Sequence, residues 1–371
     1  MSQPNGLEYA AVFAVTVAVT LLFTPLALRA ARRLQIFDAP SEIKAQDSPM
    51  PYLGGAAMVG GFAVVVLAAA LLEPPNSGLD ELAIILGLAC LLGVVGLLDD
   101  LRGLSPFLRL AIEVFAGVLV WATPAGADVF ANDLLNLAVT VGWIVVVTNA
   151  MNLLDNMDGL SAGVSAIAAG FLFVLAADNG QFLVATLAIA LAGCSLGFLR
   201  SNFHPARIYM GDAGALFLGF LLAVLALKLN FIDAPPLVAL SVPVVLLGVP
   251  LFDTALVVVN RLRHRVNPLV GGRDHTSHRL VLVGIPIRAS VALIYAASIS
   301  LGALATVLSR VDSVTGTILI AWILAVGGLF GGLLSAVPVY KSSRRRHLML
   351  QEVVAHEPEP PSGMGRAVGE P

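Results

Sequence analysis

Long apolar runs separated by short polar segments occupy the sequence from residue 9 to residue 338. Each run has about the 20 residues that an α-helix needs to cross a hydrocarbon layer of about 30 Å. The pattern therefore predicts an all-α polytopic membrane protein with about eleven transmembrane helices. The predicted spans are 9–28, 54–72, 81–98, 106–123, 134–151, 160–177, 181–199, 213–230, 237–259, 289–308 and 316–338.

The composition agrees with this prediction. Of the 371 residues, 58% are hydrophobic and only 12% are charged, whereas soluble domains are about 25% charged. We expect one polytopic domain over residues 1–350, no second soluble domain and no nucleic-acid partner. Residues 351–371 are rich in Pro, Glu and Gly and lack apolar periodicity, so a disordered cytoplasmic tail is expected. Cys90 and Cys194 lie in separate apolar runs and are interpreted as packing residues.

Positive charge alternates from one inter-span segment to the next. Nineteen of the 21 Lys and Arg residues fall in alternate segments or in the tail, and only Lys228 and Arg310 fall on the other side. By the positive-inside rule, the basic loops and the C-terminus are cytoplasmic and the N-terminus is outside. The first span is expected to stay as an anchor, because no Lys or Arg precedes it and Glu8 does.

A polar stretch, Asn149–Gly163, interrupts two apolar runs. Carboxylates near a bilayer are costly, by about 2.5–3.5 kcal/mol each at a helix centre. Asp155 and Asp158 therefore need cations, backbone donors or a polar ligand. Their spacing of three predicts that both lie on one face of a helical turn, which Asn152 extends. A solvated turn between two spans is the alternative.

Two further acidic sites lie at the ends of predicted spans, one at the end of the third span and one just before the eighth. Asp99 and Asp100 end the third span, where paired acids bind a divalent cation, accept a proton or contact a basic partner. Alternatively they are a charged helix end, with Arg102 neutralising one of them. Asp212 lies in the turn Gly211-Asp-Ala-Gly214, where it could approach a metal–phosphate group or cap the next helix.

The longest predicted cytoplasmic segment carries Arg273, His275, His278 and Arg279 after a Gly271-Gly272 pair. Guanidinium forks and imidazoles suit phosphate oxygens. Zinc is the less favoured reading of the two histidines, because no cysteine or further histidine nearby completes a tetrahedral set.

The first predicted cytoplasmic loop offers weaker signals. Lys44 is a candidate phosphate contact. Pro49 and Pro51 predict an extended entry, and Gly54-Gly55 allows the next helix to start close to a neighbour.

All these polar clusters fall on the cytoplasmic side under the charge rule, although they are spread over more than 200 residues. Independent solvated turns would be divided between both faces. The pattern therefore predicts one site for a metal ion and a phosphorylated cytoplasmic substrate.

In order and spacing, the clusters resemble those of the polyprenyl-phosphate N-acetylhexosamine-1-phosphate transferases, the glycosyltransferase 4 family. The resemblance covers most of residues 40–285. It implies eleven helices, a cytoplasmic active site at the bacterial inner membrane, and transfer of a sugar 1-phosphate from a UDP-sugar to a polyprenyl phosphate with release of UMP. Mg²⁺ is the implied cofactor, with Mn²⁺ as the alternative. A homodimer is compatible with the resemblance. The motifs are Asp99-Asp100, Asn149–Leu160, Met210–Gly214 and the loop with His275, His278 and Arg279.

The resemblance also implies roles for individual residues. The metal is expected on Asp212 with Asn152 nearby, the nucleotide at Asp155 and Asp158, with the uracil at Asp158, and the lipid phosphate at Asp99 or Asp100. A phosphate monoester has a second pKa of about 6 and is mostly ionised at neutral pH, so a strong base is hardly needed; Asp99 is favoured as acceptor of any remaining proton. The expected catalytic residues are Asp99, Asp100 and Asp155, and the expected substrate contacts are Lys44, Asp158, Arg273, His275, His278 and Arg279.

The donor sugar is predicted from a difference between the last loop of this chain and that of one branch of the family. The resemblance to the branch that transfers phospho-MurNAc-pentapeptide in peptidoglycan synthesis would imply a run of consecutive histidines in the last loop, whereas this chain reads Arg273-Asp-His-Thr-Ser-His-Arg279. This favours the WecA/TagO type, which uses UDP-N-acetylglucosamine and initiates surface polysaccharides. The peptide-bearing substrate and other UDP-hexosamines stay open.

A secondary transporter is the alternative of another class. Carriers bind substrate near the bilayer midplane, often in matched half-repeats. No repeat is visible, and the deep ionisable candidates are Glu113, which could pair with Arg109, and Asp253.

Pro243 and Pro250 predict a bend in the ninth span, which we hypothesise opens a groove for the lipid.

Overall fold

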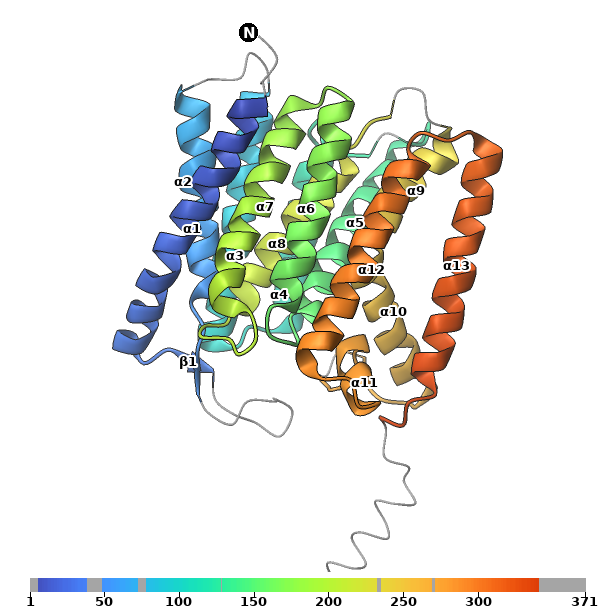
Figure 1. Cartoon of the computed structure of the whole chain (residues 1–371). Helices are drawn as coiled ribbons and strands as arrows, with labels where there is room; N and C mark the ends of the chain where they lie inside the picture. The colour runs from blue at the N-terminus through green and yellow to red at the C-terminus, as the bar shows by residue number, and fades with distance from the viewer. Residues whose placement is uncertain are drawn as a thin grey trace, which may run out of the picture.

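The computed structural model describes residues 6–38, 49–72, 78–127, 129–231, 235–268 and 271–339, and it is almost entirely helical (Figure 1). Lys44 and the predicted tail 351–371 lie outside these residues. One short antiparallel hairpin pairs β1 (Phe37–Asp38) with β2 (Met50–Pro51), so the entry predicted at Pro49 and Pro51 is extended. The helices are α1 (Gly6–Leu34), α2 (Gly54–Leu72), α3 (Leu79–Arg102), α4 (Pro106–Trp121), α5 (Asp133–Leu154), α6 (Leu160–Asp178), α7 (Phe182–Asn202), α8 (Gly211–Leu227), α9 (Pro236–Leu246), α10 (Gly248–Arg263), α11 (Thr276–Leu282), α12 (Ile287–Leu308) and α13 (Ser313–Ser335).

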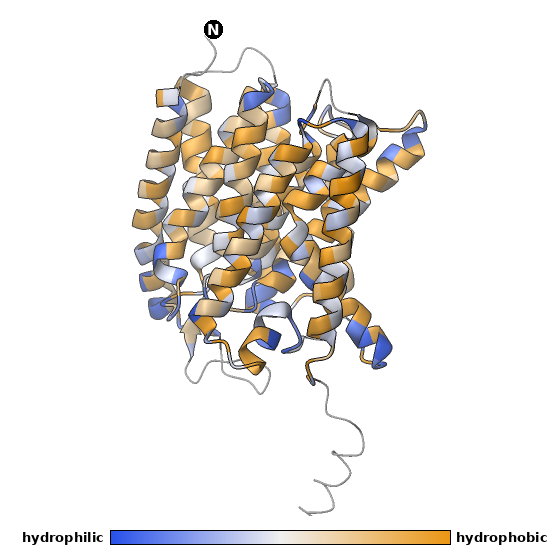
Figure 2. Ribbon diagram, turned by 45° about the vertical axis from the view of Figure 1, so that its right-hand side comes forward, coloured by the Kyte–Doolittle hydropathy of each residue, from blue (hydrophilic) through white to orange (hydrophobic). Residues whose placement is uncertain are grey.

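The prediction of a polytopic helical protein is confirmed. Each of the eleven predicted spans coincides with a helix or with the pair α9–α10. Within the described residues, eight helices are long and apolar enough to cross a membrane, and α9–α10 makes a ninth if it counts as one span. Since α4 and α8 have only 16 and 17 residues, the total of eleven crossings stays a prediction. Hydrophobic residues cover the middle of the bundle and hydrophilic ones gather towards its ends (Figure 2).

Helix α8 forms the centre of the bundle. Every side chain from Ala213 to Ala226 is buried, as expected for a helix that is apolar on all sides. Helices α3 and α5 pack against it. At the periphery, only 6% of the residues in the most apolar stretch of α13 are buried. The acidic turn at the start of α8 is thus carried by the most deeply packed helix.

The ninth predicted span is broken, as its two prolines predicted. Helices α9 and α10 meet at an angle of 77°, and the break falls at Leu247, between Pro243 and Pro250. A proline inside a helix removes a backbone donor and clashes with the preceding turn. The bend is confirmed, while the groove for a lipid stays a hypothesis.

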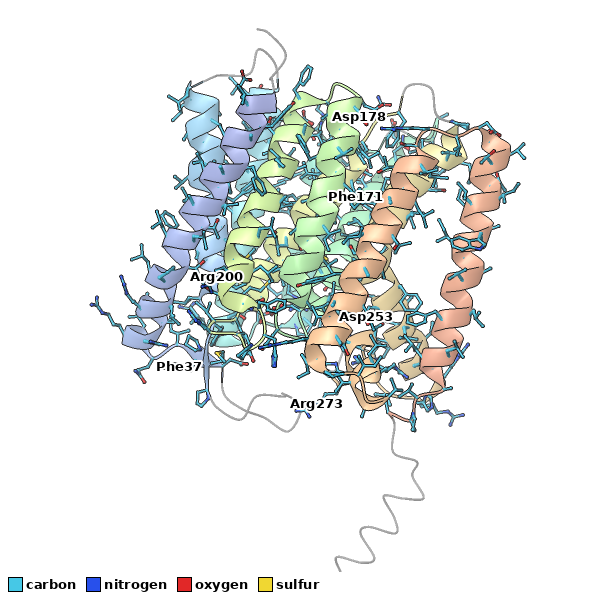
Figure 3. All side chains as sticks on the ribbon, viewed as in Figure 1. Phe37, Phe171, Asp178, Arg200, Asp253 and Arg273 are labelled. Carbon is cyan, nitrogen blue, oxygen red and sulfur yellow. The ribbon has the colours of Figure 1, made fainter. Side chains whose placement is uncertain are left out.

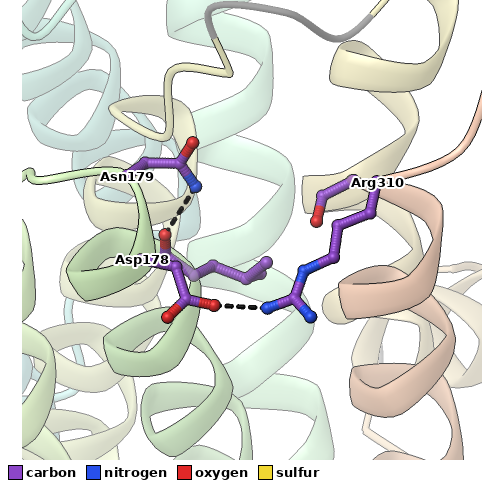
Figure 4. Close-up of a pocket in the computed structure, with 5 residues that line it drawn as sticks. Asp178, Asn179 and Arg310 are labelled. Carbon is purple, nitrogen blue, oxygen red and sulfur yellow. Dashed lines mark hydrogen bonds and ion pairs between the residues drawn. The ribbon is translucent and has the colours of Figure 1, made fainter.

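The two ends of the bundle differ in charge. Residue 6 and residue 339 lie at opposite ends (Figure 1). We call the end that carries α11 and the hairpin the site end, and the other the far end. The two basic residues that broke the charge alternation lie at the far end, and each has an acidic partner: Lys228 pairs with Glu81, and Arg310 with Asp178 (Figure 4). A pocket of 370 Å³ beside Asp178 and Arg310 holds none of the predicted site residues.

Glycines allow α2 and α3 to approach the start of α8. A Cβ on Gly55 would lie 2.1 Å from the backbone nitrogen of Gly214, and a Cβ on Gly96 would lie 2.3 Å from the carbonyl oxygen of Asp212. The close start predicted at Gly54-Gly55 is therefore confirmed. The position of Asp212 depends on backbone-to-backbone contact that no other residue type permits.

This contact generates a prediction for Gly96→Ala. Since α3 and α8 must separate to admit the methyl group, the variant should lose about 1–3 kcal/mol of stability, visible as a lower unfolding temperature of the detergent-solubilised protein. Gly87→Ala is the matched control, because Gly87 lies on the same helix and a Cβ added there would have no described atom within 4 Å. Its unfolding temperature should stay the same or rise. Equal behaviour of the two variants would contradict the close-contact explanation.

Candidate active site

Four helices bring polar side chains together at the site end. Arg109 of α4 lies between two acids: its Nη1 donates to Asp99 Oδ2 at 3.0 Å and to Asp212 Oδ2 at 3.2 Å. On the other side of Asp212, Asn152 Nδ2 donates to Oδ1 at 2.7 Å. The predicted metal pair, Asn152 and Asp212, is thus in direct contact, although 60 positions separate the two in sequence. We call Asp99, Asp100, Asp155 and Asp212 the acidic cluster.

Asp100 holds the start of α8. Its Oδ1 accepts the N–H of Asp212 at 3.0 Å and its Oδ2 accepts the N–H of Ala213 at 3.2 Å. First-turn N–H groups have no partner within their own helix and attract negative charge. Gly211 allows this approach with a φ of +67°, because a Cβ there would lie 2.4 Å from Asp100 Oδ2. The alternative that Asp212 caps its own helix is therefore wrong: Met210 is the N-cap residue, and the capping carboxylate comes from α3.

The neighbouring acid, Asp99, has different partners. Its Oδ1 accepts the N–H of Leu104 at 2.7 Å, and its Oδ2 takes the guanidinium of Arg109. Arg102, considered as the neutralising residue, is exposed, and the described part of the chain shows no such contact for it. The reason is geometric, since α3 ends at Arg102 and the chain turns back at Gly103, which brings α4 and Arg109 over the acids.

The deep carboxylate of Glu113 is engaged by its neighbours. It is fully buried, its Oε1 lies 3.9 Å from Arg109 Nε, and its Oε2 accepts from Asn149 Nδ2. The predicted pairing with Arg109 is confirmed. Glu113 therefore supports the cation that faces the acidic cluster.

Asp155 and Asp158 do not share a helical face. Helix α5 ends at Leu154 and α6 begins at Leu160, after Gly159 with a φ of +76°, so both acids lie in a turn and that part of the sequence prediction is wrong. Asp158 Oδ2 instead lies 2.8 Å from His204 Nδ1 and accepts the N–H of Ala206 at 3.0 Å. The turn is thereby fixed to the segment that leads into α8.

The carboxyl groups of this cluster are crowded and partly buried. Burial raises the pKa of Asp155 to about 8, and the carboxylates of Asp212, Asp100 and Asp158 contribute to that rise. Among the described residues, Arg109 is the one cation that the salt bridges join to the cluster. Ionisation of all four acids would place more negative charge here than Arg109 balances, so a bound cation would stabilise their ionised forms.

Charged residues at the end of α10, in the segment before α11 and in α11 itself are mostly engaged within the protein. Arg261 binds Asp274 through two contacts of 2.7 and 2.6 Å. Arg279 is fully buried and donates to the carbonyl oxygens of Asp274 and Leu334, each at 2.8 Å. This predicted substrate contact thus braces the segment against the end of α13, while Arg273 is exposed at the site end (Figure 3).

The two predicted histidines lie beside each other, with ring centroids 5.9 Å apart. His275 Nδ1 lies 2.7 Å from Asp253 Oδ2. Ser277 donates to Asn156 Oδ1 at 2.5 Å and so connects α11 to the turn that carries Asp155 and Asp158. We call residues 273–279 the histidine segment. Apart from Lys44, the predicted site residues therefore lie at the site end in two linked groups: the acidic cluster with the neighbouring Asn152 and Asp158, and the histidine segment.

Sequence reasoning missed several residues that position the site. Asn202 accepts the N–H of Gly159 at 3.0 Å and donates to the carbonyl of Ile208 at 3.0 Å. His204 faces Asp158 and also lines an open pocket of 560 Å³ together with Arg200 and Arg207. The only available signal was their place in the stretch before Met210-Gly-Asp212, where polar residues interrupt two buried helices.

Comparison with known proteins decides the family. Residues 82–230, which begin within α3 and end just after α8, match the family model described as glycosyl transferase family 4. The chain is 35% identical over 292 residues to a probable undecaprenyl-phosphate N-acetylglucosaminyl 1-phosphate transferase of Bacillus subtilis, covering 76% of this chain and 80% of that protein. The chain belongs to glycosyl transferase family 4.

Other relatives of this family 4 transferase cover it to different extents. A decaprenyl-phosphate N-acetylglucosaminephosphotransferase of Mycolicibacterium smegmatis is 34% identical over 69% of this chain and 71% of its own length. A phospho-N-acetylmuramoyl-pentapeptide-transferase of Clostridium botulinum is 37% identical, but over only 41% of this chain and 52% of its own length. The chain is thus a multi-pass membrane enzyme of the transferase class, and the alternative of a transporter loses its support.

His278 generates a prediction about pH. Burial lowers the pKa of His278 to about 4, helped by the neighbouring His275, so between pH 6.5 and 4 the unfolded chain binds a proton that the folded protein excludes. Stability should therefore fall with falling pH in this window. In His278→Gln this contribution is absent. The unfolding temperature of the wild type relative to the variant should drop from pH 7 to pH 4, and a constant difference would contradict the assignment.

Proposed function

We propose that this enzyme transfers N-acetylglucosamine 1-phosphate from UDP-N-acetylglucosamine to a polyprenyl phosphate of the undecaprenyl type, releasing UMP. The reaction depends on Mg²⁺, and the product is polyprenyl-diphosphate-N-acetylglucosamine, made in the first membrane step of a surface polysaccharide. The site end faces the cytoplasm of a bacterial inner membrane in this proposal. The names of the Bacillus and Mycolicibacterium relatives support the acceptor class and the transferred sugar phosphate.

One observation carries the proposal. At one end of a membrane bundle, Arg109 binds both Asp99 and Asp212, and Asn152 binds the other oxygen of Asp212. Asp100 binds the first N–H groups of the central helix. Phosphoryl transfer needs positioning and charge stabilisation more than covalent chemistry by the protein. A negatively charged cradle beside cationic and histidine side chains suits a metal–diphosphate substrate.

The residues present fit Mg²⁺. Mg²⁺ in proteins keeps several waters and is bound through one or two carboxylates together with substrate phosphates. The crowded carboxyl groups around Asp212 favour a cation, although the described residues contain no preformed group of three metal-binding His, Cys, Asp or Glu side chains. Asp212 and Asn152 would hold the ion, with the amide turned to present its oxygen. When bound, Mg²⁺ would neutralise charge on the diphosphate and on the departing UMP.

The chain's own groups then have separable roles. Asp99 accepts any proton left on the lipid phosphate, whose oxygen attacks the β-phosphorus of the UDP-sugar in line. Arg109 reduces the charge repulsion between Asp99 and Asp212 and holds both carboxylates in place. Asp155 and Asp158 face the nucleotide, and His275, His278, Arg273 and Lys44 contact phosphate or sugar oxygens. The polyprenyl chain lies along the bent pair α9–α10.

UDP-N-acetylglucosamine is favoured over the peptide-bearing donor for two reasons. The histidine segment lacks consecutive histidines. In addition, the pentapeptide-transferase relative matches about half of its own length, whereas the Bacillus relative matches 80%. A bulkier donor is therefore the second candidate.

Product analysis tests the proposal directly. Purified enzyme is given undecaprenyl phosphate, Mg²⁺ and an equimolar mixture of UDP-GlcNAc, UDP-GalNAc and UDP-MurNAc-pentapeptide. Mass spectrometry of the lipid fraction should show the diphosphate-linked N-acetylhexosamine formed from isotope-labelled UDP-GlcNAc, with UMP released in equal amount. Each of the lipid, the donor and the metal should be required. A lipid product carrying the pentapeptide would contradict the donor assignment.

Substitution of the metal pair gives a further prediction. Asp212→Ala and Asn152→Ala should lower the rate of UMP release by at least about 100-fold, because loss of a metal ligand removes several kcal/mol of charge stabilisation. Membrane insertion should persist, since the backbone N–H of residue 212 that Asp100 binds remains. Cys194→Ser should stay active as the control, because that thiol is buried between α7 and α2, where it donates to the carbonyl oxygen of Met58. Full activity of Asp212→Ala would remove the metal assignment.

A further inference from the structure

Asp253 is a buried carboxylate that the proposed mechanism does not use. It lies on α10, beyond the bend, and only 2% of its surface is exposed. Figure 3 places it at the site end, above the histidine segment. A buried carboxylate is costly unless its oxygens are hydrogen-bonded, so its partners indicate why it is there.

Both oxygens of Asp253 bind the start of α11. Oδ2 lies 2.7 Å from His275 Nδ1, and Oδ1 accepts the N–H of Thr276 at 2.6 Å. An ionised carboxylate can only accept hydrogen bonds, so Nδ1 of His275 carries the hydrogen. Nε2 is then the ring nitrogen left for a ligand, because the hydrogen bond of one imidazole nitrogen sets the role of the other.

We propose that Asp253 is the positioning residue of the histidine segment, which orients His275 with Nδ1–H towards α10 and presents Nε2 to a phosphate oxygen of the substrate. The role of the oxygen contact rests on the proposed function. Asp253 does not touch the substrate. Its action passes entirely through His275, as the aspartate of an Asp–His pair acts in other enzymes.

The two histidines differ in this respect. His278 has a buried Nδ1 without a partner among the described residues, and burial lowers its pKa to about 4. It is therefore neutral at physiological pH.

The position of Asp253 ties this orientation to the broken span. Asp253 is on the helix that the bend at Leu247 redirects, whereas His275 belongs to a segment 22 positions later. If the lipid chain lies along α9–α10, the same helix positions both the acceptor lipid and the ring that meets the phosphate. A carboxylate that merely fills a polar gap would not need to select one nitrogen of the ring.

A spectroscopic experiment tests the orientation without any substrate. The full chain is labelled with ¹⁵N-histidine, and His275→Gln identifies the His275 signals among those of the six histidines. We expect ¹⁵N shifts of the Nδ1–H form, or of the doubly protonated ring, in the wild type. In Asp253→Asn the amide can still accept from Thr276, but its NH₂ faces Nδ1, so the ring should change to the Nε2–H form. A wild-type ring already in the Nε2–H form would overturn the proposal.

The oxyanion contact has its own readout. Addition of inorganic pyrophosphate with Mg²⁺ should shift the Nε2 signal of His275 and leave the signals of His264, which lies at the end of α10, unchanged. The response should disappear in Asp253→Asn. An unchanged Nε2 signal in the wild type would contradict the oxyanion role, whether or not the enzyme proves to use UDP-GlcNAc.

Kinetics separate positioning from simple stabilisation. Asp253→Asn should lower kcat by about 10- to 100-fold with the KM for the donor unchanged, the range seen when the partner of a functional histidine is removed. In the His275→Gln background the same substitution should cause no further loss. Losses that multiply in the double variant would overturn the proposal, because Asp253 would then act independently of His275.

Thr254→Val is the matched control. Thr254 is the next residue on α10, and its buried hydroxyl has no partner among the described residues. Activity and the His275 signals should equal those of the wild type, and the unfolding temperatures of all variants verify folding. If wild-type enzyme shows no transfer from any UDP-sugar, the proposed function fails, while the shifts of His275 still decide the orientation.

Discussion

The start of α8 is the constraint on which the site depends. Its first N–H groups have no partner within their own helix, whose side chains from Ala213 to Ala226 are buried, so a partner has to come from elsewhere in the protein. Asp100 supplies it from α3. This contact, together with the glycines at positions 55, 96 and 211 that allow backbones to touch, fixes where Asp212 stands. Asn152 and Arg109 then meet a carboxylate whose position is already determined.

The paired acids of α3 therefore have different partners, which the sequence motif alone does not reveal. Asp100 uses both oxygens on the backbone of α8, whereas Asp99 faces Arg109. Of the two acids, Asp99 is the one for which the described residues show a side-chain partner, Arg109, and a side chain can move when a substrate arrives. For the proposed function, this difference favours Asp99 over Asp100 as the acid that meets the lipid phosphate.

Much of the fold could be predicted because the signals are local. Apolar runs of about 20 residues indicated the helices, and Pro243 and Pro250 indicated the break at Leu247. The charge alternation identified one end of the bundle as the site end. Pairings across the sequence could not be predicted in the same way. Arg109, rather than Arg102, faces Asp99, because only the turn at Gly103 determines which arginine returns over the acids. The turn after α5 shows a second limit: a spacing of three between Asp155 and Asp158 is equally compatible with a helical face and with a turn, and Gly159 at positive φ decides for the turn.

The histidine segment shows why a basic stretch overstates the number of ligand contacts. A segment that links two membrane helices needs internal anchors, because it has no core of its own. Arg261, Asp274 and Arg279 supply them, and burial makes these charges effective as anchors only because each is hydrogen-bonded. The guanidinium groups that fix the segment are thus withdrawn from the substrate. These anchors make the segment rigid, and a rigid segment can hold the neighbouring His275 in one orientation. Residues that contact only the protein itself therefore determine how precisely His275 can meet a ligand.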